Sequence, residues 1–194
     1  MKTRRTTKGR DMTIDEVNRI LAEADLLATQ DEVQRAIGRM ATEITERLHD
    51  RRPLVLCVMN GGLIIAGQIL PKLGFPLEID YVHATRYGDK TSGSGLIWRV
   101  MPNEDMRGRT VLLLDDILDE GVTLDALGRH CREQGASEVL LAVLVEKLHL
   151  RKVRPGMRAD FSGLDVGDRF LFGYGLDYKG YWRNAPGIYA VKGL

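Results

Sequence analysis

The sequence has 194 residues, of which 44% are hydrophobic and 28% charged, and a formal net charge of +1 at pH 7. This composition is that of a soluble globular protein whose core needs neither disulfides nor a structural metal. The balanced charge gives no reason to expect nucleic acid or a membrane surface as a partner, and no run reaches the roughly 20 apolar residues of a membrane span. We therefore expect a cytoplasmic protein, in which Cys57 and Cys131 are reduced thiols in or near the core.

The N-terminal part of the sequence predicts a tail and two helices. Residues 1–10 are basic, are not followed by the apolar core of a signal peptide, and are expected to form a disordered tail. The capping-box sequences Thr13-Ile14-Asp15-Glu16 and Thr29-Gln30-Asp31-Glu32 each mark the start of a helix. We expect the first helix to run to about Ala28, and the second, which has one apolar face, to end near His49.

From residue 54 onward, apolar runs of strand length alternate with helical segments. The run at 54–59 ends at Asn60-Gly61-Gly62, which is typical of a buried strand that feeds a glycine turn. The glycine- and serine-rich segment 88–95 is expected to be mobile. Strands are expected at 54–59, 77–87, 96–101, 110–114, 138–145, 169–172 and 188–191, and helices at 63–73 and 123–134. This alternation predicts an α/β fold with a mostly parallel central sheet flanked by helices.

The strand at 110–114 runs directly into an acidic segment. Four carboxylates occupy six positions there, at Asp115, Asp116, Asp119 and Glu120. Because ligands of open α/β sheets bind beyond the carboxyl ends of the strands, this segment is expected to lie in the ligand crevice. Carboxylates suit sugar hydroxyls or a hydrated Mg²⁺ ion, and the start of the next helix suits a phosphate. Helix capping is an alternative for Asp116 or Asp119 alone, but it does not explain the whole cluster.

Residues 112–124 carry a recognisable pattern: a hydrophobic strand, two acidic residues, two apolar residues and then Asp-x-Gly-x-Thr. This pattern resembles the phosphoribosyl-diphosphate (PRPP) motif of the type I phosphoribosyltransferases. The resemblance implies one domain over 11–194, with a core at about 50–160 and a small hood built from the terminal segments, about 11–50 and 160–194. It also implies that the ribose and 5′-phosphate of PRPP are bound by Asp115, Asp116, Asp119, Glu120, Gly121, Val122 and Thr123.

Three other segments, 59–62, 143–147 and 168–178, resemble the hypoxanthine-guanine branch of that family. The resemblance implies transfer of ribose 5-phosphate from PRPP to a 6-oxopurine base, with Asp119 as the catalytic residue that shares the N7 proton. It assigns purine binding to Lys147, Phe170 and Leu171. It assigns pyrophosphate binding to Asn60, Gly61, Gly62, Arg86, Tyr87 and Arg183. It assigns the cofactor Mg²⁺ to Asp177, with Asp115 and Asp116 as further candidate ligands.

The chemistry of lysine agrees with the purine assignment. Its ammonium group donates to O6 of hypoxanthine or guanine, and a buried lysine would be left unpaired against the amino group of adenine. A simpler interpretation of Lys147 is a solvated lysine at a strand end, and Phe172, unlike Phe170, is expected in the core. Structural or surface positions are expected for the four histidines, which share no spacing: His49, His83, His130 and His149.

Three positions depart from the family pattern, one of which is Val122, where several relatives have a polar or basic residue. Asn60 stands where many members carry a larger or charged residue such as lysine, and Arg86 stands where the better-known members have serine. Our hypothesis is that the added cation of Arg86 beside pyrophosphate compensates for Asn60.

Two alternative functions remain open at this point. One is a phosphoribosyltransferase that prefers xanthine, and the other is a PRPP-binding regulatory protein of the same fold. The second is disfavoured because Asp119, Lys147, Asp177 and Arg183 are all retained, and a regulator could dispense with Asp119. The resemblance implies a homodimer or homotetramer that binds PRPP and a 6-oxopurine, without nucleic acid or membrane partners.

Overall fold

The computed structural model describes residues 12–86 and 96–193, and at positions 85, 86 and 96 the backbone alone. The tail expected at 1–10, the mobile segment expected at 88–95 and Tyr87 lie outside the described residues. The elements, in chain order, are α1 (Ile14–Glu23), β1 (Asp25–Thr29), α2 (Gln30–Leu48), β2 (Leu54–Val58), α3 (Gly62–Ile69), the short 3₁₀ helix η1 (Leu70–Lys72), β3 (Glu78–Arg86), β4 (Leu96–Val100), β5 (Thr110–Leu118), α4 (Val122–Glu133), β6 (Glu138–Leu148), β7 (Phe161–Gly167), β8 (Leu171–Phe172) and β9 (Gly187–Ala190).

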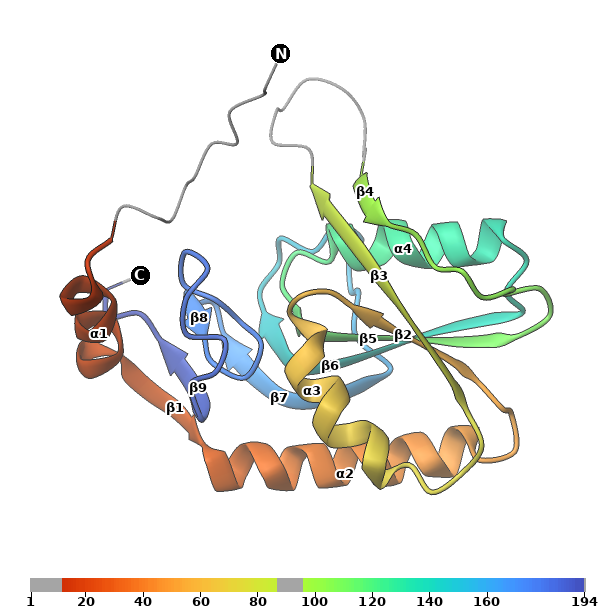
Figure 1. Cartoon of the computed structure of the whole chain (residues 1–194), viewed down its shortest axis with the longest axis horizontal. Coiled ribbons are helices and arrows are strands. Elements are labelled where there is room, and N and C mark those ends of the chain that lie inside the picture. The colour runs from red at the N-terminus through yellow and green to blue at the C-terminus, as the bar shows by residue number, and fades with distance from the viewer. Residues whose placement is uncertain (1–11, 87–95, 194) are drawn as a thin grey trace, which may run out of the picture.

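These elements form two sheets (Figure 1). The larger sheet has six strands in the order β4-β3-β2-β5-β6-β7, and every neighbouring pair is parallel except β3 and β4. The smaller sheet has three strands in the order β1-β9-β8 and joins the two terminal parts of the chain in antiparallel pairs. A mostly parallel central sheet and a separate hood from the terminal segments are therefore both confirmed. The helix α2 packs on the larger sheet, and β7 is one of its strands. The hood sheet is therefore built only from β1, β8 and β9.

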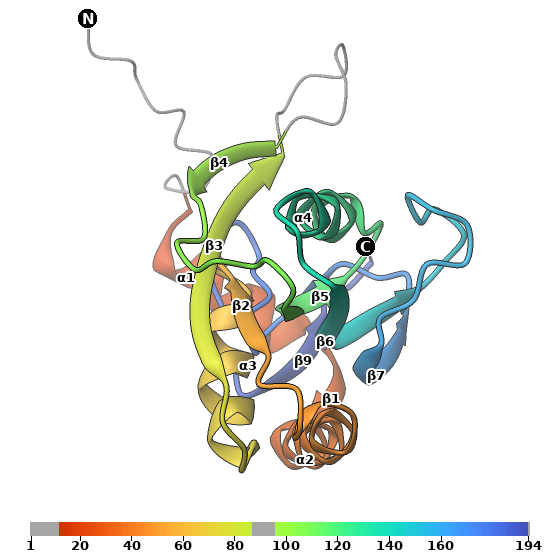
Figure 2. The same cartoon turned by 90° about the vertical axis from the view of Figure 1, so that its right-hand side faces the viewer.

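Helices cover both faces of the larger sheet. Figure 2 shows α2 and α3 on one face and α4 on the other. The alternation of side chains along each strand produces the two faces: in β5, Leu112 and Leu114 join the core under α2 and α3, whereas Val111 and Leu113 join the core under α4. None of the described helices is both long enough and apolar enough to cross a membrane.

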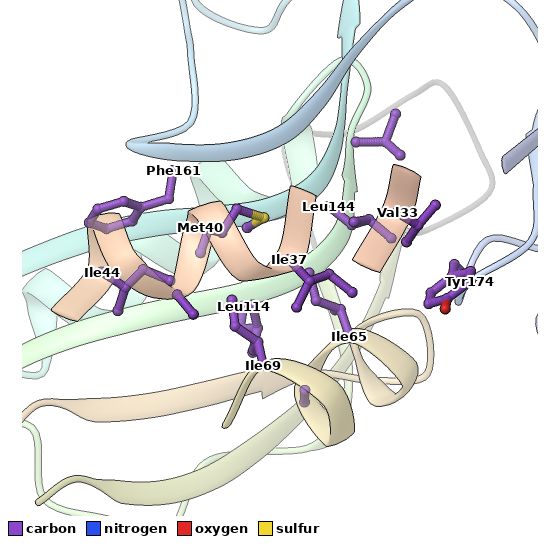
Figure 3. Close-up of a cluster of buried hydrophobic side chains, with 14 of the residues drawn as sticks. Val33, Ile37, Met40, Ile44, Ile65, Ile69, Leu114, Leu144, Phe161 and Tyr174 are labelled. Carbon is purple, nitrogen blue, oxygen red and sulfur yellow. The ribbon is translucent and has the colours of Figure 1, made fainter. Parts of the chain in front are cut away.

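The core under α2 fixes the positions of α3 and β5 (Figure 3). The helix contributes fully buried residues spaced three or four apart, on one face: Val33, Ile37, Met40 and Ile44. They pack against buried side chains of α3, β5 and β6: Ile65, Ile69, Leu114 and Leu144. Burying one such side chain contributes about 1.5–3 kcal/mol, so this packing holds α3 and β5 firmly in place. The polar turns that follow β2 and β5 are thereby fixed relative to each other.

Some expected boundaries are wrong, and two strands, β1 and β7, were not expected. The helix expected to reach Ala28 ends at Glu23, and residues 25–29 form β1. Only Ala28 of that strand is buried, and its partner β9 lies at the other end of the chain, so the local sequence carries little strand signal. β5 continues to Leu118 because its acidic residues still pair with β6. β7 was not expected, because most of its side chains are not buried.

Candidate functional site

A cavity of about 370 Å³ opens where β2 and β5 end and where α3 and α4 begin. This carboxyl edge is where open α/β sheets bind their ligands. Polar side chains from separate parts of the chain line it: Asn60, Asp115, Asp116, Asp119, Thr123, Asp177 and Arg183. The remaining lining includes backbone and apolar groups of Met59, Gly61, Ile117, Gly121, Val122, Leu171 and Leu176.

Asp115 and Asp116 form an acidic pair near the end of β5. Asp116 is 7% exposed, and a Cβ atom on Gly61 would lie 2.2 Å from its Oδ2, so the turn after β2 needs glycine there. The Asp116 N–H donates to Asp115 Oδ1 over 2.8 Å. Burial raises the pKa of both carboxyl groups, and the charge of Asp116 raises the pKa of Asp115 further. Two carboxylates held this close in the wall of a cavity favour a cation or sugar hydroxyls as a ligand.

Arg183 brings the C-terminal part of the hood over the acidic pair. Its guanidinium donates to the Asp177 carboxylate and to the Gly175 carbonyl, and it lies 3.8 Å from Asp116 Oδ2. Gly175 has a φ of +109°, and a Cβ atom on it would lie 2.3 Å from the Gly61 carbonyl oxygen. The hood and the core therefore meet at the cavity itself.

The loop after Asp119 enters α4 through Gly121. The φ of Gly121 is +80°, and a side chain there would collide with Met157 and Leu118. The first N–H groups of an α-helix lack acceptors within the helix, and Val122 and Thr123 of this first turn line the cavity. The start of α4 is therefore suited to a phosphate.

A second segment supports this loop from outside the cavity. Lys152 Nζ donates to the carbonyl oxygens of Leu118 and Asp119 over 2.8 and 2.7 Å, and the Val153 N–H donates to the Glu120 carbonyl over 2.7 Å. Burial lowers the pKa of Lys152. These three bonds fix the path of the loop that carries Asp119.

Asp119 lies beside the end of β6, because Leu118 pairs with Glu146. Its Oδ2 accepts a bond from Lys147 Nζ over 3.0 Å, and its Oδ1 lies 2.7 Å from His149 Nε2. Burial alone would raise the pKa of Asp119, but the hydrogen bonds from His149 and Lys147 and the charge of Lys147 outweigh burial and lower it. A carboxylate and an ammonium group therefore stand side by side at the rim of the cavity.

His149 is a neighbour of this site that the sequence analysis missed. The available signal was its position two residues after Lys147, because residues two apart in an extended chain face the same side. His149, Asp119 and Asp168 lie near enough to one another to share a metal ion. The Lys147 ammonium lies 3.0 Å from Asp119 and 3.9 Å from Asp168, however, so this group is neutralised by a cation of the chain itself.

The aromatic residues near the cavity differ in exposure. Phe170 is 43% exposed and meets Tyr178 edge-on, with ring centroids 5.6 Å apart. Leu171 is buried and lines the cavity, and Phe172 is fully buried against Tyr189. Phe172 is thus a core residue as expected, while Phe170 keeps part of its ring accessible for stacking.

Most of the residues predicted for the site line this one cavity: Asn60, Gly61, Asp115, Asp116, Asp119, Gly121, Val122, Thr123, Leu171, Asp177 and Arg183. Lys147 joins them through Asp119. Gly62 is buried below the cavity, and Glu120 and Phe170 stand outside its lining. The side chain of Arg86 and the whole of Tyr87 lie outside the described residues, and Ile117 is a lining residue that was not predicted.

Comparison with known proteins gives a consistent result. The sequence family described as "Phosphoribosyl transferase domain" matches residues 24–179. The hypoxanthine-guanine phosphoribosyltransferase of Bacillus subtilis (strain 168) is 32% identical over 169 residues, which cover 86% of this chain and 92% of that protein. The hypoxanthine-guanine-xanthine phosphoribosyltransferase of Tritrichomonas foetus is 31% identical over 168 residues, covering 86% and 91%. A crystal structure of a hypoxanthine phosphoribosyltransferase from Staphylococcus aureus has the same fold, with a TM-score of 0.83 at 21% identity over 93% of this chain and 97% of that one.

Proposed function

The chain belongs to the phosphoribosyl transferase domain family, and we propose that it is a purine salvage enzyme that joins hypoxanthine or guanine to the ribose 5-phosphate of PRPP. The products are IMP or GMP and pyrophosphate. The observation that carries this proposal is the Asp119–Lys147 pair, 3.0 Å apart, at the rim of a cavity that also contains an acidic pair and a helix N-terminus. The activities for which the relatives are named support the same function.

The Asp119–Lys147 pair matches one edge of a 6-oxopurine. In the reacting tautomer O6 is an acceptor and the neighbouring N7–H is a donor. Lys147 donates to O6 and Asp119 accepts from N7–H, while Phe170 stacks on the ring and the Leu171 backbone bonds to the base edge. Adenine presents an amino donor in place of O6, which would set two donors against each other at the buried Lys147, so we expect adenine to be rejected.

PRPP lies across the cavity in this proposal, from the start of α4 to the turn after β2. Its 5′-phosphate is bound by the loop residues Glu120, Gly121, Val122 and Thr123. Its ribose hydroxyls donate to Asp115 and Asp116. Its pyrophosphate is bound by Asn60, Gly61, Gly62, Arg86, Tyr87 and Arg183.

The transfer is a displacement at the anomeric carbon. N9 of the base forms a bond to C1′ as the bond from C1′ to the pyrophosphate oxygen breaks, and the N7 proton passes to Asp119. Negative charge develops on the leaving group, where the Arg183 guanidinium and the N–H groups of Gly61 and Gly62 stabilise it. General-base assistance of this kind is worth about 10²–10⁴ in rate.

We propose Mg²⁺ as the cofactor, with Asp177 as a ligand and Asp115 and Asp116 as further candidates. These side chains fit the ion, because carboxylate oxygens are the ligands that Mg²⁺ prefers and all three line the same cavity. Arg183 lies 3.8 Å from Asp116 Oδ2 and also donates to Asp177, so its single charge neutralises the three carboxylates only in part. Mg²⁺ supplies neutralisation of the pyrophosphate charge when it is bound.

We also propose that the protein is a cytoplasmic homodimer or homotetramer. Ile79 and Tyr81 on β3 are 57% and 46% exposed, and because they are two residues apart they share one face of the sheet. An exposed apolar surface of this kind suits contact with a second copy. Light scattering on the purified protein tests this, and a monomeric mass at micromolar concentration would contradict it.

A single assay tests the proposed reaction. The purified protein is incubated with PRPP, Mg²⁺ and one base at a time, and nucleotide formation is followed for hypoxanthine, guanine, xanthine and adenine. We expect product with hypoxanthine, guanine or both. No product with any base would overturn the enzyme in favour of a PRPP-binding regulator, and adenine as the best substrate would overturn the role of Lys147. Xanthine stays a candidate substrate because one relative is named for it.

A further inference from the structure

The imidazole ring of His149 has a defined partner at each nitrogen. Nδ1 accepts the backbone N–H of Arg151 over 3.1 Å, and Nε2 lies 2.7 Å from Asp119 Oδ1. A backbone N–H can only donate, so Nδ1 carries the lone pair and the ring proton is on Nε2. The His149 side chain is 5% exposed, which leaves it little freedom to turn. The neutral Nε2–H tautomer therefore donates to Asp119.

The two oxygens of Asp119 have different partners. Oδ1 accepts from His149, whereas Oδ2 accepts from Lys147. In the proposed reaction Lys147 must turn toward O6 of the base, and Oδ2 must accept the N7 proton. The terminal torsion of an aspartate is broad, so a carboxylate held by Lys147 alone would lose its orientation at that moment. The bond to His149 persists, because it uses the other oxygen.

We propose that His149 is a positioning residue for the transfer reaction: its Nε2–H fixes the Asp119 carboxylate so that Oδ2 stays beside Lys147 and faces the O6 and N7 edge of the base. This inference rests on the proposed function. The end of β6 makes the arrangement possible, because Lys147 and His149 face Asp119 while Leu148 between them is 49% exposed.

The surroundings of Asp119 supply a pH-dependent readout. Lys147, Asp168 and Arg151 are the other charged side chains at this carboxylate, and Lys152 binds the main-chain carbonyl of Asp119. The bond from His149 is the largest of the effects that lower the pKa of Asp119. Without it the carboxylate takes up a proton at higher pH, so the acid limb of kcat/KM moves to higher pH.

The experiment compares His149→Leu, His149→Gln and a control, His130→Leu, on α4, where His130 packs against Trp98 and does not line the cavity. We expect His149→Leu to lower kcat by about 10- to 100-fold, because it removes a bond to a charged group, with KM for PRPP unchanged. The amide donor of His149→Gln should restore much of the loss and return the acid limb toward its original pH. His130→Leu should leave kcat unchanged.

A double-mutant cycle separates positioning from a purely structural role. In the Asp119→Asn background, His149→Leu should lower kcat far less than it does alone, because the two changes disable the same group. An equal loss in both backgrounds, or an unchanged kcat and acid limb in His149→Leu, would overturn the inference. If the unmodified protein forms no nucleotide with any base, it is the proposed function that fails, and the role of His149 fails with it.

Discussion

The acidic run contains two regions in which the pKa values of the aspartates shift in opposite directions. Asp115 and Asp116 lie side by side within β5, and the removal of their carboxyl groups from water raises the pKa of both. Asp119 lies only three residues further on, yet the bonds from His149 and Lys147 outweigh burial and lower its pKa. The difference shows that position in a motif does not set the chemistry of a carboxylate. The neighbouring groups set it. Lys147 and His149, at the end of β6, bond to Asp119, whereas Gly61, in the turn after β2, packs against Asp116.

Replacing Asp119 gives the largest expected effect. Asp119→Asn keeps the shape but removes the charge that accepts the N7 proton, so kcat should fall by about 10²–10⁴ while nucleotide binding weakens little. Steady-state rates and nucleotide dissociation constants measure the two quantities. Asp168→Asn is a suitable control, because Asp168 also lies near Lys147, at 3.9 Å, but does not line the cavity. Equal losses in rate and binding for Asp119→Asn would rule out the general base.

Replacing Lys147 removes one of the two groups that lower the pKa of Asp119, so this carboxylate becomes more like those of the acidic pair. Lys147→Met removes a charged donor, and kcat/KM for guanine and hypoxanthine should fall by about 10- to 100-fold. The acid limb of the pH profile should move to higher pH, because a cation that lowers the pKa of Asp119 is gone. Lys72→Met, at an exposed position of η1, serves as the control. An unchanged rate with the 6-oxopurines would contradict the assignment.

Adding one methyl group where the hood meets the core tests how tightly the acidic pair is enclosed. Gly175→Ala places a Cβ atom 2.3 Å from the Gly61 carbonyl at a φ of +109°, so it should destabilise the fold by about 1–3 kcal/mol. Gly67→Ala, at an exposed position of α3 with no atom within 4 Å of the added carbon, should stabilise it slightly. Thermal unfolding measures both. Equal Tm values for the two variants would contradict the close approach.

Replacing an aspartate by asparagine should also change Tm in opposite directions in the two regions. Asp115→Asn removes a carboxyl group whose pKa the fold raises, so without Mg²⁺ it should raise Tm at pH 7 by about 2–4 °C, as expected for about 1 kcal/mol. Asp119→Asn should instead lower Tm. Because the pKa of Asp119 is lowered in the fold, its contribution is present above the ordinary aspartate pKa of 3.8 and is lost as pH falls through the folded value. If the two variants shifted Tm in the same direction at pH 7, the opposite roles given to Asp115 and Asp119 would be contradicted.

The smallest expected effect is on Cys57, which lies below the acidic pair. Burial and the charges of Asp115 and Asp116 raise the pKa of its thiol to about 12, and burial raises that of Cys131 to about 11. The folded protein at pH 8 should therefore react very slowly with a thiol reagent such as Ellman's reagent, although both cysteines are free. Unfolding in guanidinium chloride should release two reactive thiols, and rapid labelling of the folded protein would contradict the burial.

Sequence patterns predicted the parts of the fold that local chemistry decides. The capping box at Thr29 and the apolar spacing from Val33 to Ile44 predicted α2, and the unbroken apolar runs predicted the buried parallel strands. β1 and β7 were not predicted, because their strand pairing depends on β9 and β6 more than on their own composition. The boundary errors therefore fall where long-range pairing overrides local preference.

The same division holds for the candidate site. The sequence by itself determined which residues gather at the ends of the strands, because the acidic run, the Gly61-Gly62 turn and Lys147 each lie at the carboxyl end of a strand of one parallel sheet. Only the tertiary structure decided that Asp119 is shared between Lys147 and His149, while Asp116 faces Arg183. Spacing along the chain reports which side a residue faces. A hydrogen bond across neighbouring strands depends on register and side-chain direction, which only the folded chain sets.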